Sequence, residues 1–149
     1  MNIATWVERN AKRLPDRPAH AVGDTVTATW QEFADRVGHL AAGLRQQCGL
    51  APGDRVAIVM SNAPEYLEAQ FAIWYAGLVA VPVNARLHRE EIAYILEHSG
   101  TALVITDAEH AETVSPLVGV VAGMQAVVDT AGSSGRRFAR PTRLARRCR

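Results

Sequence analysis

The chain has 149 residues, of which 48% are hydrophobic and 21% charged, and these values indicate a soluble globular domain with a core of its own. Its formal net charge of +1 hides two unlike parts, because residues 136–149 contain seven arginines and no acidic residue. The nine basic and fifteen acidic residues that precede them give the remainder of the chain a net charge of −6.

Membrane-spanning and secreted classes are disfavoured by the charge pattern. The longest uncharged stretch, residues 69–85, is interrupted by polar residues, a glycine and a proline, and it is shorter than the roughly 20 apolar residues of a membrane span. Glu8 and Arg9 come too early for a secretory signal. Cys48 and Cys148 have no metal-binding or redox spacing. We therefore expect a reduced, cytoplasmic chain without a transmembrane segment.

The first segment predicts a helix followed by a hairpin. Residues 2–14 carry apolar side chains at helical intervals, which indicates a short amphipathic helix. These side chains are Ile3, Trp6, Val7, Ala11 and Leu14. Residues 19–22 and 25–29 flank Gly23-Asp24 and predict a small β-hairpin.

A long helix is predicted next. Thr29 and Glu32 have the spacing of a capping box, in which each residue bonds the backbone of the other. The apolar residues that follow fall on one helical face: Trp30, Phe33, Val37, Leu40, Ala41 and Leu44. The helix is expected to end near Gly49.

Residues 53–84 predict a strand, a helix and a second strand, and the rest of the chain is organised around this unit. The expected strands are the two apolar runs at 56–60 and 79–83. Asn62 and Glu65 have capping-box spacing at the start of the helix, and Gly77 is a good helix stop. Such β-α-β units are nearly always right-handed with parallel strands.

Strands and helices continue to alternate after Asn84. Residues 88–91 begin a helix that ends at Ser99-Gly100, and residues 103–106 are a third strand. Asp107 caps a weaker helix, and residues 125–129 are a fourth strand. The fold class is therefore α/β, with a mostly parallel sheet and flanking helices.

Motifs that would carry chemistry are missing from the sequence. The G-x-G-x-x-G fingerprint, the G-x-x-x-x-G-K-[ST] phosphate loop and the G-x-S-x-G elbow are all absent, and Lys12 is the only lysine. The five histidines lack the spacing of a helical metal pair, and Glu90-Glu91 is typical of a first helical turn. Trp74 and Tyr75 are interpreted as core rather than as a ligand pocket. We therefore name no catalytic, cofactor-binding or metal-binding residue.

The chain changes character at Thr130. Residues 130–135, TAGSSG, are interpreted as a surface loop rather than an anion cradle, and the arginine-rich end that follows has three interpretations. It is a nucleic-acid contact through phosphate charge, an unfolded solvated end, or a segment translated out of frame. The acidic body disfavours nucleic acid. Fifteen arginines against one lysine indicate a GC-rich gene, so we favour the out-of-frame hypothesis.

The central segments resemble the N-terminal region of AMP-forming acyl-CoA synthetases, members of the adenylate-forming superfamily. The resemblance covers residues 2–129 and is most like long-chain fatty acid–CoA ligases. It is carried by residues 29–33 (TWQEF), 53–56 (GDRV), 61–65 (SNAPE), Gly77, 81–84 (VPVN), 90–96 (EEIAYIL), 99–100 (SG) and 104–107 (VITD).

The resemblance implies a two-step ligase that uses ATP, magnesium and CoA and acts on a fatty or other carboxylic acid. In that family a Ser/Thr/Gly-rich loop ending in Pro-Lys-Gly holds the phosphates, whereas Arg136 and Arg137 follow TAGSSG here. No functional residue of the family is therefore assigned to this sequence, and no cofactor is expected for this chain alone.

We expect residues 1–129 to be part of the N-terminal AMP-binding-enzyme domain, truncated before the catalytic motifs, and residues 130–149 to be a disordered or out-of-frame tail. Such a fragment should be inactive alone. It should also expose an apolar face toward the missing remainder of the ligase, which favours self-association. The alternative is a non-catalytic module that binds a protein partner through that face or nucleic acid through the tail.

Overall fold

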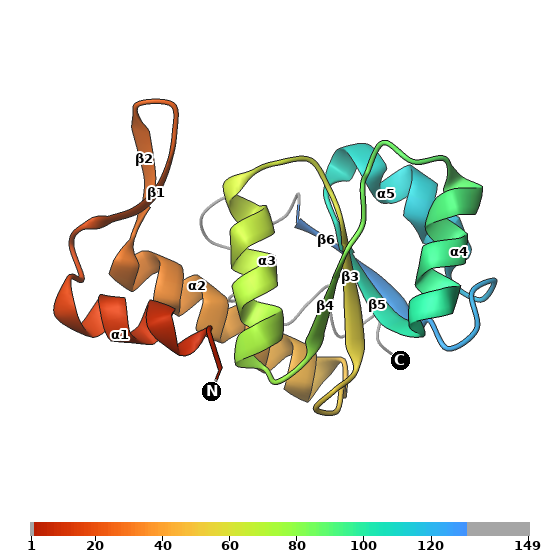
Figure 1. Ribbon diagram of the computed structural model, residues 1–149, viewed down its shortest axis with the longest axis horizontal. Helices are drawn as coiled ribbons and strands as arrows, with labels where there is room; N and C mark the ends of the chain where they lie inside the picture. Colours follow the sequence, from red (N-terminus) through yellow and green to blue (C-terminus); the bar gives the residue numbers. More distant parts are fainter. Residues whose placement is uncertain (1, 131–149) are drawn as a thin grey trace.

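The computed structural model describes residues 2–130, which form a helical layer, a small hairpin and a parallel sheet (Figure 1). The predictions for residues 131–149 concern residues that lie outside this range. The elements, in chain order, are α1 (Thr5–Arg13), β1 (Pro18–Val22), β2 (Thr25–Thr29), α2 (Trp30–Ala42), the π-helical turn η1 (Gly43–Gln47), β3 (Arg55–Val59), α3 (Pro64–Tyr75), β4 (Val79–Pro82), α4 (Arg89–Ser99), β5 (Thr101–Thr106), α5 (Ala108–Val114), the 3-10 turn η2 (Ser115–Leu117) and β6 (Ala126–Asp129).

The amphipathic helix expected near the N-terminus is α1, but its buried face is narrower than predicted. Val7 and Ala11 are buried, whereas Ile3, Trp6 and Leu14 are each about half exposed. The predicted amphipathic helix is therefore confirmed, with Val7 and Ala11 as its buried side chains. An isolated short helix has packing partners on one side only, and here α2 is the main element that packs against α1.

The hairpin and the long helix after it form as predicted. β1 and β2 pair antiparallel with two irregularities in register, and Gly23 at their turn has φ +56°. The capping box at the start of α2 is complete, since Thr29 Oγ1 accepts from the Glu32 N–H and the Glu32 carboxylate accepts from the Thr29 N–H. One face of α2 and η1 is buried as expected: Phe33, Val37, Leu40, Ala41 and Leu44.

The β-α-β unit is confirmed, with one correction at the start of α3. β3 and β4 are parallel and in direct register, with Val56 opposite Ala80. Gly77, at φ +75°, follows the end of α3. The predicted capping box of Asn62 and Glu65 was wrong. Ala63 is the N-cap and makes no side-chain hydrogen bond, and Pro64 at the next position has no N–H to satisfy.

The second half of the sheet is also as predicted. The carboxylate of Glu91 accepts from the N–H of His88 at the start of α4, and Gly100 ends that helix in the left-handed region. The guanidinium of Arg55 donates to the carbonyls of Ser99 and Gly100 at 2.9 and 2.6 Å, which ties the end of α4 to β3. These bonds satisfy carbonyls that the helix end leaves without an intrahelical partner.

The strand order β4-β3-β5-β6, all parallel, places helices on both faces of the sheet. One core lies between α1, α2, α3 and one face, and the other lies between α4, α5 and the opposite face. Alternate residues of each strand enter alternate cores, so that Val56 and Ile58 pack toward α3 while Ala57 and Val59 pack toward α4. The central strands β3 and β5 are buried on both faces, as in other parallel sheets, whereas the edge strand β4 is partly exposed.

An ion pair with a buried carboxylate, which the sequence analysis did not identify, joins α2 to α3. Arg36 Nη1 of α2 donates to Glu68 Oε1 of α3 at 2.9 Å, and the Glu68 side chain is only 8% exposed. A carboxylate inside an otherwise apolar interface is costly unless a charge is paired with it. Arg36 therefore fixes how α2 and α3 pack.

Among the described residues, no helix has the length and apolar character needed to cross a membrane.

Candidate ligand site at the carboxyl ends of the parallel strands

The sheet topology places a crevice between the ends of β3 and β5. The chain passes from β3 through α3 to β4 on one side, and then through α4 to β5 on the other side of β3. The loops that follow β3 and β5 therefore diverge to opposite faces of the sheet. Open α/β sheets bind ligands at such switch points, outside the carboxyl ends of the strands.

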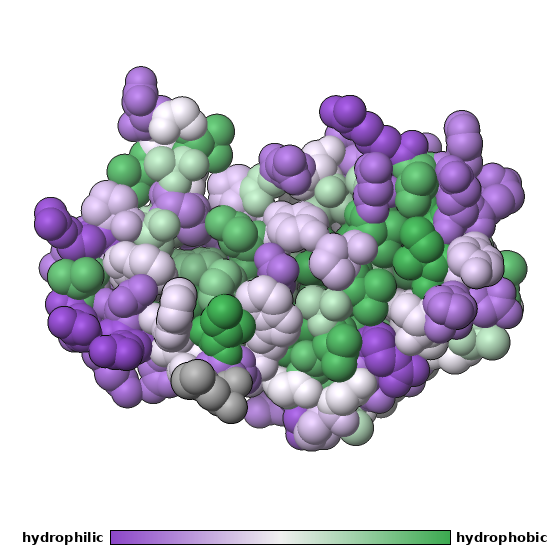
Figure 2. Space-filling model, in the orientation of Figure 1, coloured by the Kyte–Doolittle hydropathy of each residue, from purple (hydrophilic) through white to green (hydrophobic). Residues whose placement is uncertain are grey.

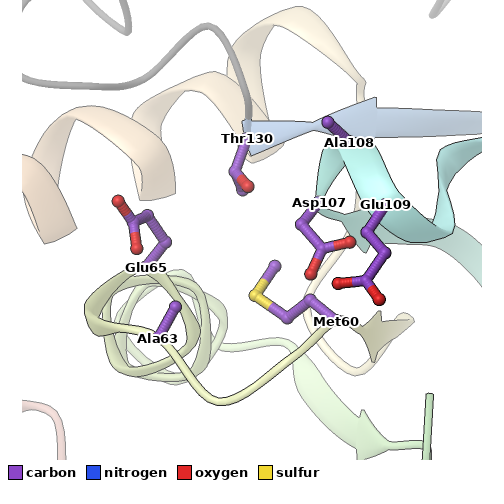
Figure 3. Close-up of a pocket in the computed structure, with 7 residues that line it drawn as sticks. All are labelled: Met60, Ala63, Glu65, Asp107, Ala108, Glu109 and Thr130. Carbon is purple, nitrogen blue, oxygen red and sulfur yellow. The ribbon is translucent and has the colours of Figure 1, made fainter. Parts of the chain in front are cut away.

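A depression lies at this switch point. Its volume is about 330 Å³, and it is lined by Met60, Ala63, Glu65, Asp107, Ala108, Glu109 and Thr130. Figure 3 shows the carboxylates of Asp107 and Glu109 on one side, that of Glu65 on the other, and the Met60 side chain between them. Three segments that follow β3, β5 and β6 therefore meet at one edge of the sheet.

Asp107 holds the loops around the depression in place. Its Oδ2 accepts from the backbone N–H of Ser61 at 2.8 Å, and its Oδ1 accepts from the N–H of His110 at 2.9 Å. The His110 ring Nδ1 also lies 2.6 Å from Oδ1. The predicted cap of α5 is confirmed, and the bond to Ser61 joins that cap to the loop after β3.

The same contacts set the charge of Asp107. Partial burial acts to raise the pKa of its carboxyl, but the hydrogen bonds from Ser61 and from His110 together lower that pKa below its usual value. Asp107 is therefore a carboxylate at neutral pH. Beneath it, the buried hydroxyl of Thr106 donates to the Val59 carbonyl at 2.7 Å and locks the ends of β3 and β5 together.

A cation could be considered at Asp107, Glu109 and His110, whose potential ligand atoms all lie within 4.8 Å of one another. Both oxygens of Asp107 already accept hydrogen bonds, and the Ser61 hydroxyl lies 3.3 Å from the Glu109 carboxylate. These contacts are those of a helix cap. The sequence analysis did not identify this cluster as a group, although residues that directly follow parallel strands are expected to meet at one edge.

The electrostatics of the depression do not suit a triphosphate. Three of its seven lining residues are acidic and none is basic. Lys12, the only lysine of the chain, lies on α1 and pairs with Glu8 at 2.8 Å. Carboxylates repel phosphate oxygens, which proteins bind with cationic side chains, backbone N–H groups or a bridging metal. This lining gives no cationic side chain to a phosphate, and the absence of an ATP site from the described residues stays a prediction.

The other residues weighed in the sequence lie away from this edge. His88 is exposed at the start of α4, and His98 is exposed near its end, where its ring stacks on Tyr94 with centroids 5.7 Å apart. The interpretation of Tyr75 as core was wrong, because its side chain is 45% exposed at the end of α3. Trp74 is half-buried and packs edge-on against Phe71. That no catalytic, cofactor-binding or metal-binding residue is assigned stays a prediction.

The sequence pattern of the AMP-binding enzyme family matches residues 7–142 of the chain, which is most of its length. The chain belongs to this family. The match runs past Thr130, and the expected division of the chain at residues 129 and 130 stays a prediction.

Relatives in this family are acyl-CoA ligases, and the chain matches their N-terminal region. It is 44% identical over 115 residues to a feruloyl-CoA synthase of Amycolatopsis sp, a match that covers 77% of this chain and 23% of the relative. It is 34% identical over 118 residues to a long-chain-fatty-acid–CoA ligase of Salmonella typhimurium, covering 78% of this chain and 21% of that protein. The chain thus spans less than a quarter of the length of these relatives.

Solved structures confirm the fold. The N-terminal domain of FACL13 from Mycobacterium tuberculosis superposes with a TM-score of 0.75 at 26% identity, covering 87% of this chain and 34% of that one. A benzoate CoA ligase from Burkholderia xenovorans gives a TM-score of 0.77 at 26% identity, covering 87% of this chain and 26% of the ligase. The four-stranded sheet with flanking helices is therefore part of the N-terminal subdomain of adenylate-forming enzymes.

Proposed function

We propose that this chain builds the first layer of an AMP-forming acyl-CoA ligase and contributes scaffold rather than reacting groups. The observation that carries the proposal is the depression at the switch point, outside the carboxyl ends of the parallel strands, which is lined by three carboxylates and by no basic residue. In this proposal Asp107 positions the loops that follow β3 and β5, and it does not touch substrate.

The reaction of the intact enzyme would take place in two steps. A carboxylate oxygen of the substrate attacks the α-phosphorus of ATP and releases pyrophosphate, which leaves an acyl-adenylate. The thiol of CoA then attacks the acyl carbonyl and releases AMP. ATP, magnesium and CoA belong to this whole reaction, and the names of the relatives support an aromatic or fatty carboxylic acid as substrate. A cytoplasmic location is part of the same proposal.

The 149-residue chain alone should not activate a carboxylate. The test is exchange of labelled pyrophosphate into ATP with ferulate, benzoate and a long-chain fatty acid in turn, with the intact feruloyl-CoA synthase as positive control. Exchange above the background of a no-enzyme sample is not expected. Robust exchange that depends on the acid would show that the chain contains its own adenylation site and would overturn the scaffold proposal.

A second candidate function is protein association, which the apolar surface favours. Figure 2 shows apolar side chains gathered over β4 and between β4 and α4. Val79 of β4 is 46% exposed, and Tyr75 at the end of α3, four residues earlier, is 45% exposed. Light scattering after gel filtration from low to high micromolar concentration tests this function. A mass that rises with concentration supports it, and a constant monomer mass contradicts it.

A further inference from the structure

His20 of β1 combines a buried ring nitrogen with contacts to three other elements. Its Nδ1 lies 2.6 Å from the Thr27 hydroxyl on β2, and its ring meets Phe33 of α2 edge-on, with centroids 5.1 Å apart. Its Nε2 is buried and has no hydrogen-bond partner among the described residues. The same side chain lines a depression of about 360 Å³ that Pro64, Tyr66 and Leu67 of α3 close from the other side.

The hydrogen bonds assign the tautomer of this ring. The Thr27 hydroxyl has one proton, and it donates that proton to the His20 carbonyl at 3.2 Å. Nδ1–H then donates in the 2.6 Å contact and Nε2 carries a lone pair, whereas the other tautomer would bury an Nε2–H with no acceptor among the described residues. The neutral ring then leaves one buried acceptor without a donor, which costs less than an unpaired N–H of a charged ring in the same place.

Protonation of the ring would cost more. It adds an N–H at the buried Nε2, for which no acceptor is in place among the described residues, and it puts a positive charge on a partly buried ring. The charged and titratable groups that face the ring are Arg36 of α2 and Glu65, Tyr66 and Glu68 of α3. Glu68 attracts an imidazolium, but its Oε1 already accepts from Arg36 at 2.9 Å.

We propose that His20 is a pH-sensitive latch, which holds the β1–β2 hairpin against α2 and α3 while it is neutral and releases the hairpin when it is protonated. Release would open the depression between the hairpin and α3 while the parallel sheet stays folded. The two are separable because β1 and β2 form a two-stranded sheet of their own, with no strand paired to β3, β4, β5 or β6.

The direction of the pH dependence follows from burial. Burial is the main cause that lowers the pKa of His20 below its ordinary value, against the opposing charge of Glu68. The released hairpin exposes a histidine of ordinary pKa, about 6.5, and so binds a proton more readily than the docked hairpin. The docked state therefore keeps its full stability at pH values above about 6.5 and loses stability at lower pH. The equilibrium constant for docking falls by at most about tenfold for each pH unit.

Hydrogen exchange of the 149-residue chain at pH 7.5, 6.5 and 5.5 tests the proposal. Protection factors, corrected for the intrinsic pH dependence of exchange, should fall up to about tenfold for amides of β1 and β2 between pH 6.5 and 5.5. Those of β3 and β5 should not change. An equal loss of protection in the hairpin and the sheet would overturn the latch, since it would report global unfolding.

Two variants and one titration sharpen the result. His20→Gln should abolish the pH dependence of hairpin protection, whereas His39→Gln, on the exposed side of α2, should retain it. If His20→Gln does not fold, the ring C–H resonance of His20 in the unaltered chain decides by NMR. Titration of His20 below about pH 6.5, the ordinary value for histidine, supports the latch, and titration at or above that value overturns it.

Discussion

The β1–β2 hairpin and the parallel sheet are built from similar β-branched residues but are held in different ways. Val56, Ile58 and Val59 of β3 are fully buried, whereas Val22 and Val26 of the hairpin are 58% and 50% exposed. The sheet is covered by helices on both faces, and the hairpin is covered on one side by α2 and α3 through His20 and Ala28. Apolar composition alone therefore does not show which strands carry the stability of the fold.

The two regions should differ most in how much free energy of unfolding is lost when an apolar side chain is truncated to alanine. Ile58→Ala should lower the free energy of unfolding by about 3 kcal/mol, because it removes buried contacts and leaves a cavity. Val22→Ala in the hairpin should change it by less than about 0.5 kcal/mol. Urea unfolding followed by circular dichroism checks both. Equal losses would mean that the hairpin and the sheet share one core.

The second comparison is between two ion pairs with nearly equal N–O distances, one with a buried carboxylate and one exposed. Arg36→Ala should cost about 2 kcal/mol, since it leaves Glu68 buried without its partner charge. Lys12→Ala removes the exposed Lys12–Glu8 pair of α1 and should cost less than about 0.5 kcal/mol.

The double variant Arg36→Ala with Glu68→Ala should recover part of the loss, because no uncompensated charge then remains. A double variant less stable than the Arg36→Ala single variant would show that the unpaired charge of Glu68 is not the cause of the loss.

Two glycines with similar backbone angles, one beside the parallel sheet and one in the hairpin turn, provide a third comparison. Gly100, at φ +62°, has the Arg55 guanidinium in the space that a Cβ would fill, and Gly23, at φ +56°, has nothing within 4 Å. Gly100→Ala should cost about 2 kcal/mol, from backbone strain and from loss of the Arg55 bonds to the end of α4. Gly23→Ala should cost about 1 kcal/mol from strain alone. Thermal unfolding of the two variants side by side gives the difference.

The last prediction concerns Asp107, whose contribution to stability depends on pH. The pKa of this carboxyl is lower in the folded chain than in the unfolded chain, where it is about 3.9. The ionised carboxylate therefore stabilises the fold above about pH 3.9, and this stabilisation is lost as the pH falls through the folded-state pKa. Asp107→Asn should therefore destabilise the chain by about 1 kcal/mol at pH 7, and the difference should shrink toward pH 3. A difference that stays constant across urea unfolding experiments at pH 7, 5, 4 and 3 would contradict this origin.

The sheet could be predicted from the sequence because its signals are local. Apolar runs of strand length, a capping box at Thr29 and stop glycines at 77 and 100 each act within a few residues, and the structure has strands and helices where they indicate. The predicted cap at Asn62 failed because Pro64, at the first helical position, leaves one fewer N–H to be capped.

Features that depend on distant residues were missed. In the sequence, Glu68 has no feature that distinguishes it from other charged helix residues. Its pairing with Arg36 depends on the packing of α3 against α2. Trp6 and Tyr75 have the residue type of a core but lie where no described element covers them. The bond from Ser61 to Asp107 joins residues 46 positions apart, and it required the strand order β4-β3-β5-β6.

The scaffold proposal is tested most directly by a chimera. Residues 1–129 of this chain would replace the matched segment of the Amycolatopsis feruloyl-CoA synthase, and feruloyl-CoA formation from ferulate, ATP and CoA would be followed by absorbance. If this chain provides scaffold and the rest of the ligase provides the reacting groups, the chimera should form the thioester, and the same chimera with Asp107→Ala should form it more slowly. A folded chimera that forms no thioester would contradict the proposal.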